Sequence, residues 1–160
     1  MNDFIRTIKN PMKFRMFLIS KLPMGWIAGL KIADVSEEKC TVTIPYKYLT
    51  QNPFKSIYFA CLSMAAEMST GVLGMMHIYK SKPAVSILVV VMDAQLIKKA
   101  TGKISFTCND GKKIAETINQ SIITGEGRTV TAVSSGFSET GEKVAEFKIT
   151  WSFKAKSVKN

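Results

Sequence analysis

Apolar and polar residues alternate over several stretches of this chain, which is the pattern of strands with one covered face. In the clearest stretch, apolar residues occupy every second position from 145 to 153, and polar residues separate them. Shorter stretches of this kind lie at 40–44 and 104–108, and residues 26–35 and 128–137 also favour strands. The polar turn at 36–39 joins 26–35 and 40–44 into a predicted hairpin, and 139–142 is a second predicted turn.

A different spacing predicts two helices. Asn10-Pro11 combines a capping residue with proline at the first helical position, and an apolar stripe between basic residues follows as far as Pro23. Isoleucines then recur every four residues from Ile114 to Ile122, with a glycine soon after. We therefore predict an N-terminal helix at about 11–21 and a short helix inserted among the later strands.

Two further segments are apolar without a clear period. Residues 85–92 are mostly β-branched, which predicts a strand covered on both faces near the middle of a sheet, continuing to Leu96. The run from Ile57 to Ile78, which Ser56 can cap, predicts a long helix that is apolar on every side. One sheet covers only part of such a helix, so we expect a second subunit to complete its burial. The order of elements predicts an α+β domain with a curved, mostly antiparallel sheet.

The run from 57 to 78 is also long enough to span a bilayer. Its one charged residue, Glu67, lies at the middle, where burial in lipid is most costly, and Ser63, Ser69 and Thr70 dilute the run. The strands that follow it need a soluble core. We therefore expect no transmembrane segment.

Composition places the chain among ordinary globular proteins, with 160 residues of which 46% are hydrophobic. Three cysteines without a CxxC pair argue against a disulfide framework or a zinc site, and the start of the chain lacks a signal peptide, so we expect a cytoplasmic protein. The net charge of +10 favours anionic partners, or simply a well-solvated surface. The lysine runs are short and no basic helix carries interleaved aromatics, so we expect no nucleic-acid binding.

Glu67 is the clearest candidate for chemistry, because no residue of opposite charge lies within one helical turn of it. Burial among apolar residues should raise its pKa and make it a usable general base near neutral pH. It could instead attack a carbonyl group directly. The alternative is a structural acid, hydrogen-bonded across an interface or paired with a lysine of another strand.

Several short motifs occur in an informative order. They are Leu22-Pro23 and Gly29 before a strand, Asn52 in the loop ahead of the long helix, Ala65-Ala66-Glu67 followed by Gly71 within it, the segment 99–103, and the closing strands from 127 to 151. Together they resemble the hotdog-fold thioesterase superfamily, in a branch near the PaaI-type acyl-CoA thioesterases. The resemblance covers about residues 22–154.

The resemblance implies a single hotdog domain over residues 1–160, with a sheet wrapped around the central helix and an additional N-terminal helix. It implies a homodimer formed by joining two sheets edge to edge, with a tetramer left open. Thioesters of coenzyme A or of an acyl-carrier protein would bind at the dimer interface. No cofactor is implied.

The chain departs from the family at the start of the long helix. PaaI-type enzymes carry His-Gly-Gly there, with an acid seven residues after the second glycine, whereas this chain has Tyr58-Phe59-Ala60 followed by Glu67. The acid is retained and the glycines are not. Without glycine the helix start is more crowded, which hinders close approach of a thioester carbonyl to backbone N–H groups.

The start of the long helix is nevertheless a candidate site. The free N–H groups and positive dipole end near Tyr58, Phe59 and Ala60 would stabilise a developing oxyanion, unless this is merely a capped terminus. Asn52 could position substrate or water, or could be a turn residue before proline. Thr70 could hold the attacking water, or could bond to its own helix backbone.

The phosphates of coenzyme A would need cations at the rim of the pocket. Lys99 and Arg128 flank turns among the predicted strands and are candidates, although either could be solvated surface. The only histidine, His77, lies ten residues beyond Glu67, nearly three turns along the helix and too far for a direct dyad. No set of metal ligands is present in the sequence, so we expect no metal site.

We therefore expect a thioesterase for acyl-CoA or acyl-carrier-protein thioesters, with Glu67 as general base or nucleophile, assisted by Asn52. A non-catalytic hotdog module that binds acyl-CoA or an acyl chain is the alternative, and the missing glycines favour it. A basic interaction protein without a pocket would follow if a dimer buried Glu67 in a closed salt bridge.

Overall fold

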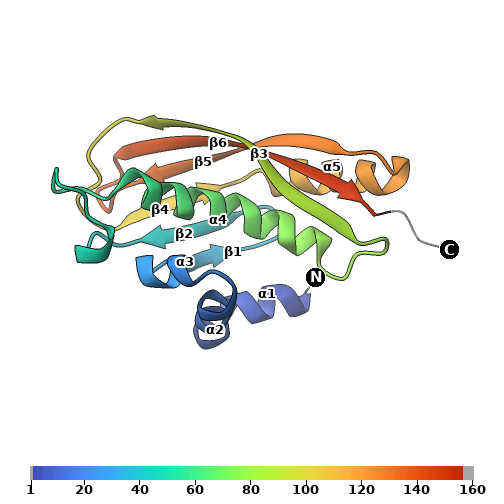
Figure 1. Cartoon of the computed structure of the whole chain (residues 1–160), viewed down its shortest axis with the longest axis horizontal. Helices are drawn as coiled ribbons and strands as arrows, with labels where there is room; N and C mark the ends of the chain where they lie inside the picture. Colours follow the sequence, from blue (N-terminus) through green and yellow to red (C-terminus); the bar gives the residue numbers. More distant parts are fainter. Residues whose placement is uncertain (1, 157–160) are drawn as a thin grey trace.

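A computed structural model describes residues 2–156 of the chain (Figure 1). Its helices and strands follow the chain in this order: α1 (Asn2–Lys9), α2 (Pro11–Lys21), α3 (Pro23–Ala28), β1 (Lys31–Val35), β2 (Cys40–Ile44), the 3₁₀ turn η1 (Tyr48–Thr50), α4 (Phe59–Ile78), β3 (Val85–Leu96), β4 (Ile104–Cys108), α5 (Gly111–Thr124), β5 (Arg128–Phe137) and β6 (Lys143–Ala155).

The strands form one six-stranded sheet in the order β1-β2-β4-β5-β6-β3, and every neighbouring pair is antiparallel. The sheet curves around α4, which contacts β2, β4, β5 and β6, and α1 to α3 lie on the lower side in Figure 1. The prediction of a curved antiparallel sheet around one long helix is therefore confirmed.

The core lies between α4 and the inner face of the sheet. Every second residue of β2, β4 and β6 points into it, and the alternation that predicted these strands also selects their buried positions. Phe106 and Phe147 meet edge to face there, with ring centroids 5.6 Å apart. The predicted strands 40–44, 104–108 and 128–137 are all confirmed.

Two glycines let the sheet approach α4 closely. A Cβ added at Gly71 would lie 3.2 Å from the ring of Trp151, and one at Gly74 would lie 3.0 Å from Ile87 and 3.2 Å from Phe153. The buried hydroxyl of Ser69 is satisfied as well, because it bonds to the carbonyl of Ala66 on the same helix and to the hydroxyl of Ser134 on β5. α4 is long and apolar enough to cross a bilayer, but 67% of its most apolar window is buried inside this fold, as in a core helix.

The hairpin prediction was wrong in its first half. Residues 26–28 belong to the helix α3 instead of a strand, because Pro23 begins a new helical turn and Gly29, at φ +81°, ends it in the left-handed conformation. The strand β1 begins only at Lys31 and pairs with β2 as expected.

The predicted cap of the long helix was also wrong. The helix begins at Phe59 with Tyr58 as N-cap, and Tyr58 makes no side-chain capping bond. Ser56 instead bonds to Asn52 within the preceding loop, where its hydroxyl accepts a hydrogen bond from Nδ2 at 3.0 Å. The N-terminal cap was predicted correctly, since Asn10 Oδ1 accepts from the backbone N–H groups of Met12 and Lys13.

β3 lies at the edge of the sheet, so the prediction of a strand near the middle of the sheet was wrong. It pairs only with β6, and no other strand in the described part of the chain pairs with its outer edge. Apolar residues on it are exposed, namely Leu88, Val90, Val91, Met92 and Leu96. A continuous apolar run predicts two covered faces, and a single copy of this chain leaves much of the strand uncovered.

The start of α5 depends on a close backbone contact at Gly111. A Cβ there would lie 2.2 Å from the carbonyl oxygen of Glu37 and 2.6 Å from Cα of Glu38, and this backbone has no flexible end to move aside. Gly111→Ala should therefore lower the free energy of unfolding by about 1–3 kcal/mol. Gly127→Ala is the matched control, since nothing lies within 4 Å of its added Cβ. Urea denaturation would measure both, and equal stabilities would contradict this contact.

Candidate functional site

Glu67 lies in the middle of α4, where its side chain is partly buried beside a cavity of about 420 Å³. The cavity is largely apolar. One wall comes from Phe14, Phe17 and Lys21 of α2 and from Leu22 just after it, and the opposite wall comes from Ile87 of β3 and Trp151 of β6. The cavity therefore offers an apolar space with one carboxylate at its side.

The carboxylate of Glu67 makes no ion pair and no hydrogen bond with the part of the chain that the structure describes. Burial raises the pKa of Glu67 above its ordinary value, and no charged neighbour opposes this shift. Lys21 lines the same cavity without coming within ion-pair distance. Glu67 therefore has the environment of a carboxyl group that holds its proton more tightly than an exposed carboxyl group does.

Thr70 and Gly71 position the wall of this cavity. Trp151 Nε1 donates to Thr70 Oγ1 at 2.9 Å, and Thr70 Oγ1 donates to the backbone carbonyl of Glu67 at 2.9 Å. Thr70 is fully buried, so its hydroxyl holds the indole ring and is closed to water from the cavity. At Gly71, an added Cβ would lie 3.4 Å from Oε1 of Glu67 and 3.2 Å from the indole ring.

A second cavity of about 590 Å³ lies at the start of α4. It brings together four of the predicted site residues, Asn52, Tyr58, Phe59 and Lys99. Within residues 2–156, the backbone N–H groups of Phe59 and Ala60 have no hydrogen-bond partner, whereas that of Cys61 is bonded to the carbonyl of Tyr58. The first turn of α4 can therefore donate two hydrogen bonds, and Phe59 lines this cavity whereas Ala60 does not.

The side chain of Asn52 is occupied within its own loop. Its Oδ1 accepts from the backbone N–H groups of Phe54 and Ser56, and its Nδ2 donates to the hydroxyl of Ser56. This is the geometry of a turn-forming asparagine. Asn52 lines the cavity mainly as the residue that shapes the loop before α4.

The two predicted cations lie at opposite ends of the sheet. Lys99 Nζ donates to the carbonyl of Phe54 at 3.3 Å, beside the cavity at the start of α4. Arg128 pairs with Glu126 at 3.0 Å and lies opposite Phe153, near the end of β6. The backbone just before Lys99 instead bonds to the carbonyl of Val144, at the start of β6. Strand spacing puts these ends about 30 Å apart. One chain therefore cannot use both on the same phosphate group.

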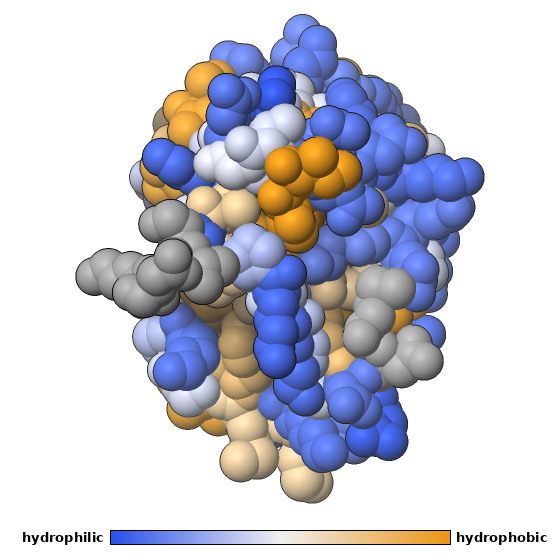
Figure 2. All heavy atoms as spheres, turned by 90° about the vertical axis from the view of Figure 1, so that its right-hand side faces the viewer, coloured by the Kyte–Doolittle hydropathy of each residue, from blue (hydrophilic) through white to orange (hydrophobic). Residues whose placement is uncertain are grey.

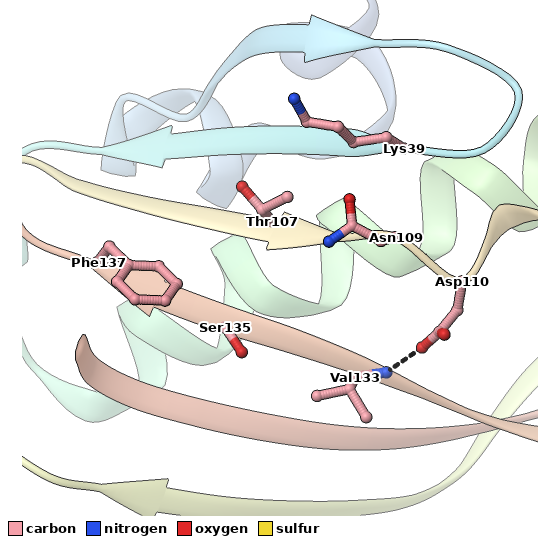
Figure 3. A pocket seen from close by; sticks show the side chains of 7 residues that line it. All are labelled: Lys39, Thr107, Asn109, Asp110, Val133, Ser135 and Phe137. Carbon is pink, nitrogen blue, oxygen red and sulfur yellow. Dashed lines mark hydrogen bonds between the residues drawn. The ribbon is translucent and has the colours of Figure 1, made fainter. Parts of the chain in front are cut away.

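A third hollow, of about 580 Å³, lies on the face of the sheet away from α4 (Figure 3). It is lined by Lys39, Thr107, Asn109, Asp110 and Ser135, among others. Several of these groups are already bonded within the fold: Asp110 Oδ2 accepts from the backbone N–H of a β5 residue at 2.7 Å, and Lys39 pairs at 2.9 Å with an aspartate of β1. This hollow therefore presents a polar sheet surface without a reactive group.

The sequence pattern missed the walls of the Glu67 cavity. Phe14 and Phe17 of α2, and Leu22 just after it, lie some fifty residues earlier in the chain, and local spacing carries no signal for such a contact. Gly71 was part of the family resemblance, but its close approach to Trp151 was not foreseen. In the described part of the chain, no three His, Cys, Asp or Glu side chains group closely enough to hold a metal ion.

A curved antiparallel sheet wrapped around one long helix defines the hotdog fold, and solved structures with this architecture resemble the chain. A protein of unknown function from Pseudomonas aeruginosa, described as a probable thioesterase, gives a TM-score of 0.77 at 18% identity, over 91% of this chain and 97% of that one. A protein of unknown function from Chlorobaculum tepidum gives 0.75 at 15% identity, over 91% and 97%. A thioesterase from Haemophilus influenzae gives 0.62 at 10% identity, over 91% of each chain.

Identities this low establish the shared fold and leave the activity open. None of the curated proteins matches the sequence. Residues 11–153 match the family described as domain of unknown function DUF4442, and the chain belongs to that family.

The raised pKa of Glu67 predicts a dependence of stability on pH. As the pH rises, the unfolded chain loses this proton before the folded chain does, so stability falls across that window and the penalty persists above it. Glu67→Gln should therefore raise the melting temperature at pH 7, and the gain should shrink as the pH is lowered and vanish at about pH 3, where both states hold the proton. Exposed Glu116 on α5 is the matched control, since Glu116→Gln should change the melting temperature little at either pH. Equal effects of the two substitutions at pH 7 would count against a desolvated Glu67.

Proposed function

We propose that this protein hydrolyses acyl thioesters, with coenzyme A or an acyl-carrier protein as the thiol carrier. The observation that carries the proposal is the unpaired carboxylate of Glu67 beside an apolar cavity of about 420 Å³. A cavity of this kind suits an acyl chain, and a carboxylate at its side suits the reacting end of that chain. The hotdog proteins of similar structure that are described as thioesterases support the same class of reaction.

In the proposed reaction, Glu67 takes a proton from water as the water oxygen bonds to the thioester carbonyl carbon. The tetrahedral intermediate then loses its C–S bond, and the proton passes to the departing thiolate, which leaves a carboxylic acid and a thiol. In a second version, Glu67 itself attacks the carbonyl carbon, and water then hydrolyses the resulting anhydride. Both versions require the ionised form of Glu67, so turnover should increase as the pH rises through its raised pKa.

The N–H groups of Phe59 and Ala60 are the proposed donors to the developing oxyanion. They lie eight and seven residues before Glu67 on the same helix, and a rise of 1.5 Å per residue separates them from it by about 10–12 Å. The cavity at the start of α4, which Phe59 lines, and the cavity beside Glu67 share no lining residue. We therefore propose that one copy of the chain contributes the helix start and a second copy contributes Glu67.

The free edge of β3 supports such a dimer. Its exposed apolar residues continue into Ile97 and, through the cavity at the start of α4, into exposed Phe54 and Phe59. Antiparallel pairing of two β3 edges would bury this surface and satisfy unpaired backbone groups. A two-fold axis through that pair makes the two α4 helices antiparallel, so the start of one helix approaches the middle of the other. It also turns the Arg128 end of one sheet toward the Lys99 end of the other.

One observation favours a binding module without catalysis. The rings of Tyr58 and Phe59 meet edge to face at 4.9 Å beside the first turn of α4, where related thioesterases carry glycine. These rings narrow the approach to the two N–H groups. The second candidate function is therefore the binding of acyl-CoA or an acyl chain, and measurements of turnover and binding together distinguish it from hydrolysis.

Hydrolysis predicts that the wild-type chain releases free thiol from medium- or long-chain acyl-CoA, and that Glu67→Gln lowers kcat/KM by a factor of about 10² to 10⁴. The substitution removes the base and keeps the shape, so acyl-CoA should still raise the melting temperature of the variant. Glu116→Gln is expected to turn over substrate like wild type. Thermal stabilisation by acyl-CoA without any turnover would assign the binding module instead.

The dimer predicts that charge on the β3 edge separates the subunits. Leu88→Lys together with Val90→Lys places like charges across the two-fold axis in a surface that is otherwise apolar, so sedimentation velocity should show a monomer where wild type shows a dimer. Ile123→Lys on α5 adds a charge at an exposed apolar residue elsewhere and should remain dimeric. A monomeric wild type, or a dimeric edge variant, would refute pairing through β3.

A further inference from the structure

The outer face of α2 carries an apolar stripe that nothing in residues 2–156 covers. Phe14 and Leu18 face the core, whereas Met12, Met16 and Ile19 lie on the opposite side, with 73%, 65% and 49% of their surfaces exposed. Spacings of four and three residues place these three side chains in one row along the helix. Met24 and Ile27 of α3 are exposed as well and extend the apolar surface beyond the end of α2. The N-terminal helices therefore present more apolar surface than their packing against the core requires.

This apolar row lies in the most basic part of the chain. No acidic residue occurs between Asp3 and Asp34, and six lysines and arginines do: Arg6, Lys9, Lys13, Arg15, Lys21 and Lys31. Lys13 and Arg15 flank the row on its two sides by their helical positions. Salt bridges in the described part of the chain involve neither of them. Figure 2 shows moderately hydrophobic groups projecting among hydrophilic ones at its lower edge, where Figure 1 places α2.

A cavity of about 520 Å³ lies between α1, α2, α3 and β1, and Arg15, which flanks the row, lines it. Its interior is apolar, with Ile8, Leu18 and Leu30 among its lining residues, and the exposed cations Lys9, Arg15 and Lys31 also line it. Trp26 lines the same cavity, and its ring lies 5.9 Å from the guanidinium carbon of Arg15. An apolar interior with cations and a tryptophan at the surface matches the boundary between lipid acyl chains and anionic headgroups.

We propose that the outer face of α2 and α3 docks on the surface of an anionic membrane. The row of Met12, Met16 and Ile19 enters the boundary between headgroups and acyl chains, while Lys13 and Arg15 contact lipid phosphates. An unbranched methionine side chain adapts to a disordered acyl layer. An acidic protein surface would pair with the cations and leave the apolar row in water, so the combination of both features favours the lipid surface. This proposal does not depend on the thioesterase activity.

The test uses the full chain and vesicles of phosphatidylcholine, with or without phosphatidylglycerol. We expect co-sedimentation with the anionic vesicles only, and a loss of binding as salt is added. Substituting Met12→Ser, Met16→Ser and Ile19→Ser together should weaken binding about tenfold or more, because three apolar side chains no longer enter the lipid. Ile123→Ser, at a residue 75% exposed on α5, is the apolar control and should bind like wild type.

The electrostatic contribution has its own pair of variants. Lys13→Gln with Arg15→Gln should weaken binding to anionic vesicles, and Lys148→Gln with Lys154→Gln, which removes two exposed charges from β6, should weaken it much less. Equal losses in the two pairs would indicate attraction by net charge alone and would overturn the docking surface.

Tryptophan fluorescence reports the contact directly. The chain has two tryptophans, of which Trp26 is 40% exposed and Trp151 is 5% exposed. Anionic vesicles should shift the emission to shorter wavelength, and lipids brominated on their acyl chains should quench it. Both effects should disappear in Trp26→Phe, whose vesicle binding is measured in parallel by sedimentation. The proposal is overturned if the wild-type chain does not co-sediment with anionic vesicles. It is also overturned if the triple substitution changes the oligomeric state in solution and leaves vesicle binding intact.

Discussion

The enclosure of a helix that is apolar on every side is the constraint on which the rest of this structure depends. The sheet approaches α4 closely because Gly71 and Gly74 have no side chains, and the ring of Trp151 fills the space above Gly71. The same tryptophan is held by Thr70, which also bonds to the carbonyl of Glu67. The contacts that bury the helix therefore also determine where its only carboxylate lies, and leave that carboxylate without a compensating charge.

The same constraint supports the proposal of a second copy of the chain. One curved sheet covers the core side of α4, and α2 with α3 covers part of the remainder, but the first turn of α4 and the edge of β3 stay open. Both openings are apolar, and both are adjacent to the cavity that contains the free N–H groups of the helix. A second copy of the chain that covers these surfaces would complete the burial of the helix and the candidate site together.

The strands were predictable wherever one face is buried and the other meets solvent. In β6 the alternation of apolar and polar residues shows which side chains are buried. β3 is apolar at nearly every position, and that pattern does not distinguish a central strand from an edge strand that another copy covers. Glu67 was singled out as a candidate because a lone acid in an apolar run has no local partner. The cavity beside it was not, because Phe14 and Trp151 meet only through the tertiary fold. Ser56 failed as a cap since Asn52 holds its hydroxyl in the loop.

The helix α2 has apolar residues on two different faces, one buried and one exposed. Its inner residues form a wall of the Glu67 cavity, and its outer row faces away from the core, so the apolar positions surround the helix and conceal the single stripe that normally marks a surface helix. An α-helix with its side chains is about 10–12 Å across, so only that distance separates the outer row from the cavity. If the outer row lies on a bilayer, an acyl chain that leaves the lipid needs to pass only one helix to reach the carboxylate of Glu67. The basic net charge, the exposed methionines and the apolar cavity would then serve one substrate class, a thioester whose acyl chain resides at a membrane surface.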